Sequence, residues 1–329
     1  MAHIVAASPD GPRGDEELSP EQQADYDNLM LLCLDHHRLI DGHNADTYTA
    51  EQLREYKQKH EERIQRQTAV GPEYATTVVR FESPIGDLRV AVRRADAYQA
   101  LYPYFPADDK GVFFDYRTKP GRGDEAFWAA FAAEVSDEVR RSFIKGNDEQ
   151  RYDHLSIFAL APIPILVHLG NQLGNVVAAE LYQKHRDTND WKWKAEPESD
   201  PFKYQLNKSE GTDKKNVALV LSLSGKIAPE AYQTIAASMS VYEIEVESAN
   251  PGFLQHRSRL EKFRVTYRQV MSEIGAKYGG DCTVHLFPAI PTPIAVLCGK
   301  ELLPKSDPTV RVYDNDKAKG GFVPTLTIN

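Results

Sequence analysis

Four side chains near the N-terminus could together hydrolyse a phosphodiester. His3 is followed by a long polar loop, and Asn28, His36 and His37 come after that loop. Hydrolysis near neutral pH requires a base that deprotonates water and a divalent metal that polarises a phosphate oxygen. Imidazole suits the role of base, because its pKa lies near neutrality. One interpretation of this set is therefore a metal-dependent nuclease.

The same residues also allow a structural interpretation. Two adjacent histidines in a helix more often face solvent or support packing than bind a metal. The functional interpretation is favoured by the whole ordered set, in which Cys33, Arg38 and Asp41 accompany the histidines and the amide. His60, further along the chain, is assigned to a surface or packing position.

The segments AHIVAASPDGPRGD (residues 2–15) and DNLMLLCLDHHRLID (residues 27–41) resemble the HNH family of ββα-metal nucleases. The resemblance implies that His3 is the general base and that the Asn28 amide braces the loop. It also implies that His37 is a metal ligand on the helix, with His36 as a neighbouring candidate. The sequence leaves Mg, Mn, Ni and Zn open, and Mg is the metal we expect for DNA cleavage.

Two features depart from the HNH pattern. Ala2 stands where the family has an acidic metal ligand, and only two residues precede His3 in this sequence. Because family members have further sequence there, we expect the first strand and its metal-supporting residues to be incomplete. Whether this chain cleaves DNA by itself is therefore left open by the sequence.

Four later segments resemble the SAVED domain, a fusion of two CARF-like α/β units that binds cyclic oligonucleotides. They are FALAPIPILVHLGNQLGN, ELYQKHRDTNDWKW, NVALVLSLSGKI and VLCGKELLPKSDPTVRVYD. An HNH segment followed by a SAVED domain is the arrangement of one class of effector in the CBASS systems of antiphage signalling. The resemblance therefore implies an endonuclease that a cyclic di- or trinucleotide activates.

A receptor for such a ligand needs cations and backbone N–H groups for phosphates, and aromatic faces for bases. The residues that could supply these groups are Tyr182, Gln183, His185, Arg186, Trp191, Trp193, Ser222, Ser224, Gly225, Lys300 and Tyr313. The tryptophans could instead form a packing cluster, and Arg186 could pair with Asp187 or Asp190.

The pattern of the chain predicts two domains. Residues 1–68 contain a turn-rich loop at residues 7–17 and a helix over residues 49–67, with Thr49 and Gln52 as a capping box. Residues 69–329 alternate β-branched runs with helical patterns at residues 124–145, 229–239 and 260–278, which favours an α/β fold. Apolar strands that lead into loops near Pro162 and Pro288 suggest two similar halves, without an exact repeat.

Composition limits the partners that this chain can have. The net charge of -9 argues against a generally basic surface, so we expect DNA contacts to be local and without sequence preference. Three scattered cysteines predict reduced, mostly buried thiols and not a disulfide framework. The sequence has no apolar run long enough to span a membrane and no signal peptide, which predicts a cytoplasmic location.

Two functional hypotheses remain. The first is a nuclease that forms homo-oligomers on activation, which would gather the basic residues Arg38, Arg54, Lys57 and Lys59 around one DNA duplex. A hinge at residues 69–72 is the alternative way to couple the two domains. The second hypothesis is a sensor whose nuclease remnant serves only in assembly. An α/β hydrolase or a nucleosidase has little support, since the chain has no G-x-S-x-G motif, no P-loop and no G-x-G-x-x-G motif.

Overall fold

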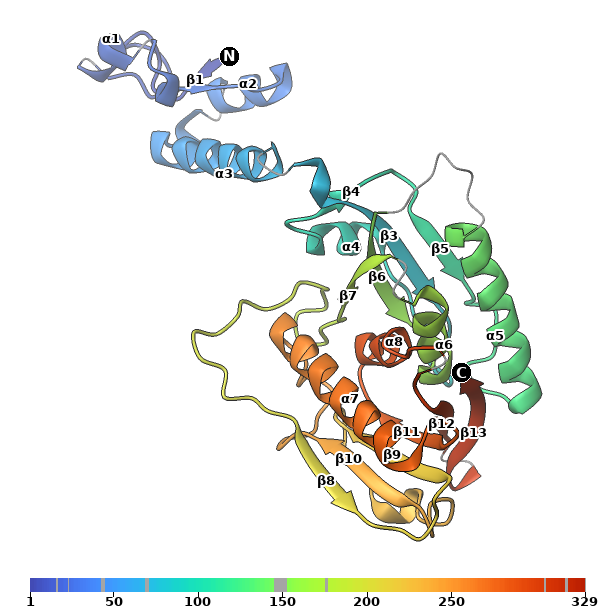
Figure 1. Ribbon diagram of the computed structural model, residues 1–329. Helices are drawn as coiled ribbons and strands as arrows, with labels where there is room; N and C mark the ends of the chain where they lie inside the picture. Colours follow the sequence, from blue (N-terminus) through green and yellow to red (C-terminus); the bar gives the residue numbers. More distant parts are fainter. Residues whose placement is uncertain are drawn as a thin grey trace. The chain divides into compact units, whose positions relative to one another are not determined.

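The computed structural model describes residues 1–15, 17–22, 24–42, 45–68, 71–144, 153–174, 177–304, 306–316 and 319–328. The chain divides into two compact units, Met1–Tyr74 and Ala75–Asn329, each drawn in Figure 1. The boundary follows Tyr74, whereas the sequence predicted it after residue 68. Residues 69 and 70 of the predicted hinge lie outside the described residues.

The N-terminal unit is a small antiparallel sheet with helices after it. Strand β1 (Ala2–His3) pairs with β2 (Leu29–Met30), and helix α1 (Leu18–Gln22) lies in the loop between them. Helix α2 (Leu34–Asp41) follows β2, and α3 (Ala50–Thr68) follows α2. The unit has its own core of Ala2, Ile4, Met30, Ile40 and Leu53.

The predicted capping box at the start of α3 is confirmed. The Thr49 hydroxyl accepts a hydrogen bond from the Gln52 backbone N–H at 3.2 Å, and the Gln52 side chain accepts one from the Thr49 N–H at 3.0 Å. These two bonds satisfy donors that a helix start leaves without partners.

The second unit begins with a parallel sheet in the order β4-β3-β6-β7, and β5 pairs with β3. Its strands are β3 (Ala75–Glu82), β4 (Phe105–Pro106), β5 (Val112–Asp115), β6 (His154–Leu160) and β7 (Ala178–Tyr182). Its helices are α4 (Arg94–Ala100), α5 (Glu125–Val139) and α6 (Ile163–Leu173). Parallel strands connected through helices are the α/β arrangement that the sequence predicted.

A six-stranded sheet in the order β13-β12-β11-β9-β10-β8 follows. Its strands are β8 (Gln205–Ser209), β9 (Asn216–Ser222), β10 (Ser240–Glu245), β11 (Thr283–Ala289), β12 (Thr309–Asp316) and β13 (Gly321–Ile328). The inner pairs are parallel, and the edge strands β8 and β13 are antiparallel to their neighbours. Helices α7 (Arg257–Tyr278) and α8 (Thr292–Lys300) connect strands of this sheet.

Helices α6 and α8 pack against each other and are related by a short sequence repeat (Figure 1). Residues 162–170 and 291–299 both read P-x-P-I-x-V-x-x-G, and each run starts a helix after a buried strand. A Cβ on Gly170 would overlap the Val296 carbonyl, and a Cβ on Gly299 would overlap the Val167 carbonyl. The expectation that the two halves share no exact repeat is wrong over this stretch.

Some predicted elements differ in the structure. The apolar runs at residues 155–170 and 282–300 each contain a strand and then a helix, because an apolar run has no periodicity that separates the two. The strand-like run LRVAVRR, residues 88–94, forms no strand. The predicted helix at residues 229–239 is only a short 3-10 turn, Pro229–Ala231, followed by further turns.

Candidate functional site

In the N-terminal unit, Asn28 fixes the backbone that follows His3. His3 ends β1 opposite Leu29, and the Asn28 side chain is buried. Its amide donates to the Val5 carbonyl at 2.8 Å and accepts from the Val5 N–H at 2.7 Å. Two hydrogen bonds from the buried Asn28 side chain therefore hold the loop after His3 in place.

Arg13, which the sequence interpretation passed over, ties the same loop to the end of α2. Its guanidinium donates to the carbonyls of Ile4 and Ile40, both at 2.7 Å, and to the Asp41 carboxylate at 2.5 Å. Asp41 in turn lies 3.3 Å from Nε2 of His37. Arg13 has a positive φ of 57°, which aims the side chain back across the loop. A mostly buried arginine is expected to have partners, but the sequence could not show that Arg13 is buried.

His36 and His37, the two histidines predicted as metal ligands, contact different partners. His36 has its Nδ1 3.0 Å from the thiol of Cys33, and this contact raises the pKa of His36. Cys33 is exposed, whereas Cys282 and Cys298 are buried. Within the described ranges, no three His, Cys, Asp or Glu side chains come together as a metal site. His37 and Asp41 offer two ligand groups, which is fewer than a metal site requires.

Four of the predicted ligand residues are buried and pack or hydrogen-bond within the fold, and His185 is buried to a similar extent. Tyr182 and Trp191 pack against Phe158, and both have rings inside the core. Tyr313 stacks on Phe287, and its hydroxyl lies 2.8 Å from Nδ1 of His285. These side chains are predominantly apolar, so their burial in the core is favourable.

Ser222 is the fourth of these residues. Its buried hydroxyl donates to the Glu243 carboxylate at 2.7 Å and accepts from the Ile227 N–H at 3.2 Å. Ser224 and Gly225 are partly exposed in the loop after β9, and the Ser224 N–H donates to the Ala289 carbonyl at 2.7 Å. Arg186 is exposed, and the remaining predicted residues, Gln183, His185 and Trp193, lie together in the segment after β7.

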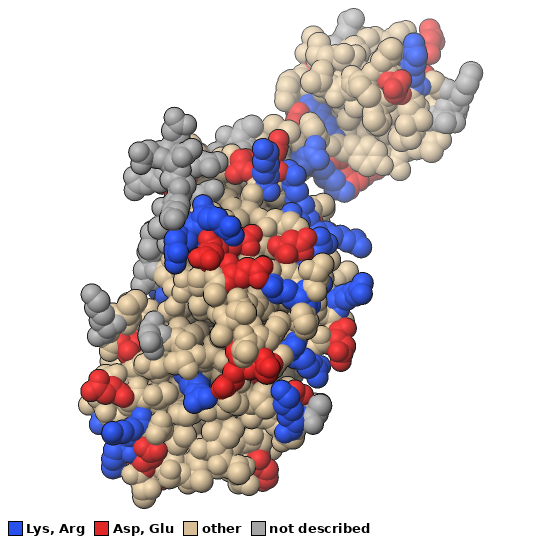
Figure 2. Space-filling view, turned by 90° about the vertical axis from the view of Figure 1, so that its right-hand side faces the viewer, with Lys and Arg blue, Asp and Glu red and all other residues tan. Residues whose placement is uncertain are grey.

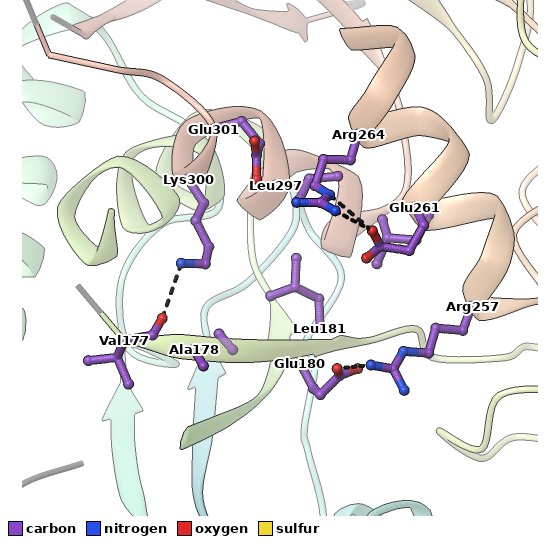
Figure 3. Close-up of a pocket in the computed structure, with 12 residues that line it drawn as sticks. Val177, Ala178, Glu180, Leu181, Arg257, Glu261, Arg264, Leu297, Lys300 and Glu301 are labelled. Carbon is purple, nitrogen blue, oxygen red and sulfur yellow. Dashed lines mark hydrogen bonds and ion pairs between the residues drawn. The ribbon is translucent and has the colours of Figure 1, made fainter. Parts of the chain in front are cut away.

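Lys300 lines a pocket of about 410 Å³ along the edge strand β7 (Figure 3). Residues 177–181 form one wall, and α7 and α8 form the others. Lys300 Nζ donates to the carbonyls of Gly174 and Val177, the latter at 3.2 Å, and burial lowers the pKa of Lys300. The pocket therefore contains an ammonium group that only backbone carbonyls hold.

Two arginines from α7 add to the charge of this pocket. Arg257 forms an ion pair with Glu180, and Arg264 forms one with Glu261 at 2.9 Å (Figure 3). Burial raises the pKa of Glu180, an effect that Arg257 partly opposes. The sequence interpretation missed both arginines. Their spacing with Leu260 and Glu261 at helical intervals was the signal that could have indicated a shared face.

Acidic and basic side chains are intermixed on the face shown in Figure 2, without one continuous basic surface. The predicted basic set of the N-terminal unit is wrong for Lys57, whose buried ammonium donates to the Tyr26 carbonyl. Lys59 pairs with Glu55 at 2.5 Å. In the parts of the chain that the structure describes, no helix is both long enough and apolar enough to cross a membrane.

Comparison with known proteins addresses the fold. A structure of the Acinetobacter baumannii Cap4 SAVED/CARF-domain containing receptor matches with a TM-score of 0.51 and 12% identity, over 95% of this chain and 65% of that one. The same receptor with the cyclic trinucleotide 3′3′3′-cAAA matches with a TM-score of 0.50 and 13% identity, over 78% and 52%. This chain thus spans between half and two thirds of the receptor. No curated protein sequence matches it.

A family profile identifies the larger unit. The profile of SAVED, the "SMODS-associated and fused to various effectors sensor domain", matches residues 135–328. This range covers more than half of the chain and includes both copies of the P-x-P-I-x-V-x-x-G run. The chain therefore belongs to the SAVED family of sensor domains.

Proposed function

We propose that the unit of residues 75–329 is a sensor that binds a cyclic oligonucleotide in antiphage signalling. The observation that carries this proposal is the membership of the SAVED family, and a receptor of the same fold has been solved with a cyclic trinucleotide. The pocket beside β7 has a volume in the range of small-molecule sites. Its cations match the phosphates of such a ligand.

The chemistry of the pocket suggests how phosphates would be held. Arg257 and Arg264 have fork-shaped guanidinium groups that can hold phosphate oxygens by paired hydrogen bonds, and Lys300 adds a point charge. The carboxylates of Glu180 and Glu261 form ion pairs with the two arginines. A phosphate would exchange places with these carboxylates, so the arginines are ordered before the ligand arrives.

Thermal unfolding with and without cyclic triadenylate, and with other cyclic di- and trinucleotides, tests this proposal. A ligand at 100 times its dissociation constant should stabilise the fold by about 2.7 kcal/mol. Arg264→Ala should weaken binding at least tenfold. Arg140→Ala is the matched control, because Arg140 also pairs with an acidic residue three positions earlier but lies outside the pocket. Equal binding by the two variants would exclude this pocket.

We further propose that the N-terminal unit is a DNA endonuclease of the HNH class that ligand binding activates. The order of the elements β1, β2 and α2 along the chain supports this proposal. The hydrogen bonds that hold the loop after His3, and the positions of Asn28 and His37, support it as well. His3 would take the proton of the attacking water. The competing proposal is a non-catalytic assembly arm, and it is supported by the finding that the described residues include no group of three metal-ligating side chains.

Cleavage of plasmid DNA with Mg²⁺, with and without cyclic nucleotide, distinguishes the two proposals. A nuclease should lose cleavage in His3→Ala and keep it in His60→Ala, a control on α3. An assembly arm should cut no DNA under any of these conditions, including with Mn²⁺, Ni²⁺ or Zn²⁺. Because phosphate contacts dominate when DNA is bound without sequence preference, affinity for DNA should fall steeply with salt.

Activation should also change the assembly of the protein. The net charge of -9 makes one chain a poor DNA binder, so several chains around one duplex would supply more cations than one chain can. Light scattering should show a larger molar mass with the activating nucleotide than without it. An unchanged molar mass in an activated sample would exclude activation by assembly and favour a motion within one chain.

A further inference from the structure

The segment that follows β7 and the residue before α7 contain buried polar atoms without a hydrogen-bond partner among the described residues. They are Oε1 of Gln183, Nε2 of His185, Nε1 of Trp191, Nε1 of Trp193 and Nδ1 of His256. A buried polar group without a partner costs about 1–3 kcal/mol, and native structures contain few of them. Several in one short segment indicate a place where a partner is supplied from outside the chain.

These atoms belong to one region of the fold. The rings of His185 and Trp193 meet edge to face with their centroids 5.9 Å apart. The backbone N–H of Lys194, which follows Trp193, donates to the carbonyl of Gln255, which precedes His256, at 3.0 Å. The segment after β7 and the start of α7 are therefore joined where these side chains lie.

Residues 183–204 form a long irregular connection between β7 and β8. All residues from 183 to 204 are described, and they form no helix or strand. Connections longer than about 12–15 residues without secondary structure are uncommon in compact domains and are usually functional. Glu196 fastens this segment to α7, because its carboxylate accepts from the Ser258 N–H at 2.9 Å and from the Ser258 hydroxyl at 2.5 Å.

The chemistry of the unpartnered atoms points to a nucleobase. Indole N–H groups donate, an amide oxygen accepts, and an imidazole nitrogen does one or the other. Burial lowers the pKa of His185, so this imidazole is neutral near pH 7. A mixed set of neutral donors and acceptors matches the edge of a base, whereas a phosphate calls for the cations of the neighbouring pocket.

The two regions adjoin at the start of α7. His256 carries one of the unpartnered atoms, and the next residue, Arg257, lines the pocket along β7. Consecutive Cα atoms lie about 3.8 Å apart, which is within the span of one nucleotide. A phosphate bound at Arg257 would therefore lie one residue along the chain from a base bound at His256.

We propose that Gln183, His185, Trp193 and His256 form a base-reading set that hydrogen-bonds one nucleobase of the ligand. This inference rests on the proposed sensor function. Trp191 lies behind the set, fully buried against Phe158. The set decides which base the sensor accepts, and the cations of the pocket contribute affinity for any base.

Trp193→Phe tests the proposal, because it removes the indole N–H and keeps an aromatic ring. Isothermal titration with cyclic triadenylate, and with trinucleotides in which guanine or uracil replaces one adenine, measures affinity for each base. The variant should bind the preferred ligand about tenfold more weakly, about 1.4 kcal/mol, and the ratio between bases should shrink. Trp128→Phe, the same change in the core beside α6, should keep the wild-type ratio.

A second measurement excludes a purely structural role for Trp193. Removing an unpartnered buried donor relieves a cost, so Trp193→Phe should leave the melting temperature of the ligand-free protein unchanged or higher. Unchanged base ratios, or a weaker affinity that accompanies a lower melting temperature, would overturn the base-reading set. Failure of the wild-type protein to bind any of these nucleotides would overturn the sensor proposal itself, and this inference with it.

Discussion

Gly170 and Gly299 face each other's helices at equivalent positions. A Cβ on Gly170 would lie 2.8 Å from the backbone nitrogen of Lys300, and a Cβ on Gly299 would lie 2.7 Å from that of Asn171. Each glycine also meets the carbonyl of the valine three positions before the other glycine. The two halves of the sensor unit are thus joined by a backbone-to-backbone contact that is nearly symmetric.

This contact predicts that an added methyl group is costly. Gly170→Ala and Gly299→Ala should each destabilise the sensor unit by about 1–3 kcal/mol or more, because the overlapped atoms are backbone and cannot change rotamer. Gly280→Ala is the control, since a Cβ at Gly280 meets no atom within 4 Å. Urea unfolding gives the three values, and equal midpoints would show that the helices separate freely.

Replacement of Arg13 should release the loop after His3. Arg13→Ala removes hydrogen bonds to two carbonyls and one carboxylate, and we expect a loss of at least about 2 kcal/mol in local stability. Amide exchange at Ile4 and Val5, whose N–H groups bond to Asn28, should then be about 30-fold faster. Arg13→Lys should rescue little, because one ammonium cannot reach all three acceptors. Arg54→Ala, at an exposed position on α3, should leave the exchange as it is.

Buried histidines should make the sensor unit sensitive to mild acid. Burial lowers the pKa of His154, His168, His185 and His285 below the ordinary value of 6.5. The unfolded chain then binds protons that the folded chain does not, so stability is present above pH 6.5 and is lost as the pH falls below it. In His168→Gln the fall in the free energy of unfolding between pH 7 and 5 should be smaller. A slope equal to that of the wild type would contradict this prediction.

Glu180 should give a pH dependence of opposite sign. Burial raises its pKa above the ordinary value of 4.5, so the folded chain holds this proton to a higher pH than the unfolded chain does. Its contribution to stability is complete below pH 4.5 and is lost as the pH rises through the raised pKa. The stability of Glu180→Gln relative to wild type should therefore increase between pH 4 and pH 7. Chemical denaturation across this range measures the difference, and a decrease would mean that the ion pair with Arg257 dominates.

Strands bordered by polar residues were predictable from the sequence. Where a strand ends and a helix begins within an apolar run was not predictable. The segments that became β3, β9 and β10 are β-branched runs with polar residues at or near their ends, a pattern that favours strands. In the run at residues 155–170 both the strand and the following helix are buried on every side, so neither leaves an alternating pattern. The P-x-P-I-x-V-x-x-G repeat lies within these runs. The contact of α6 with α8 explains why both runs have a glycine at the same position.

The candidate site was only partly predictable for a related reason. Aromatic side chains such as Tyr182 and Tyr313 suit both a ligand and a core, and only burial separates the two uses. Lys300 was predicted from its place after a glycine, and it does line a pocket. Arg257 and Arg264 reach that pocket from a helix far along the chain, so their proximity to β7 depends on the tertiary fold.

The contact of α6 with α8 also determines how the sensor unit can move. Where side chains separate two helices, the helices can shift by exchanging rotamers. At Gly170 and Gly299 no side chain separates the two backbones, so a change of rotamer cannot accommodate a shift. We therefore expect the contact to resist sliding of α6 along α8.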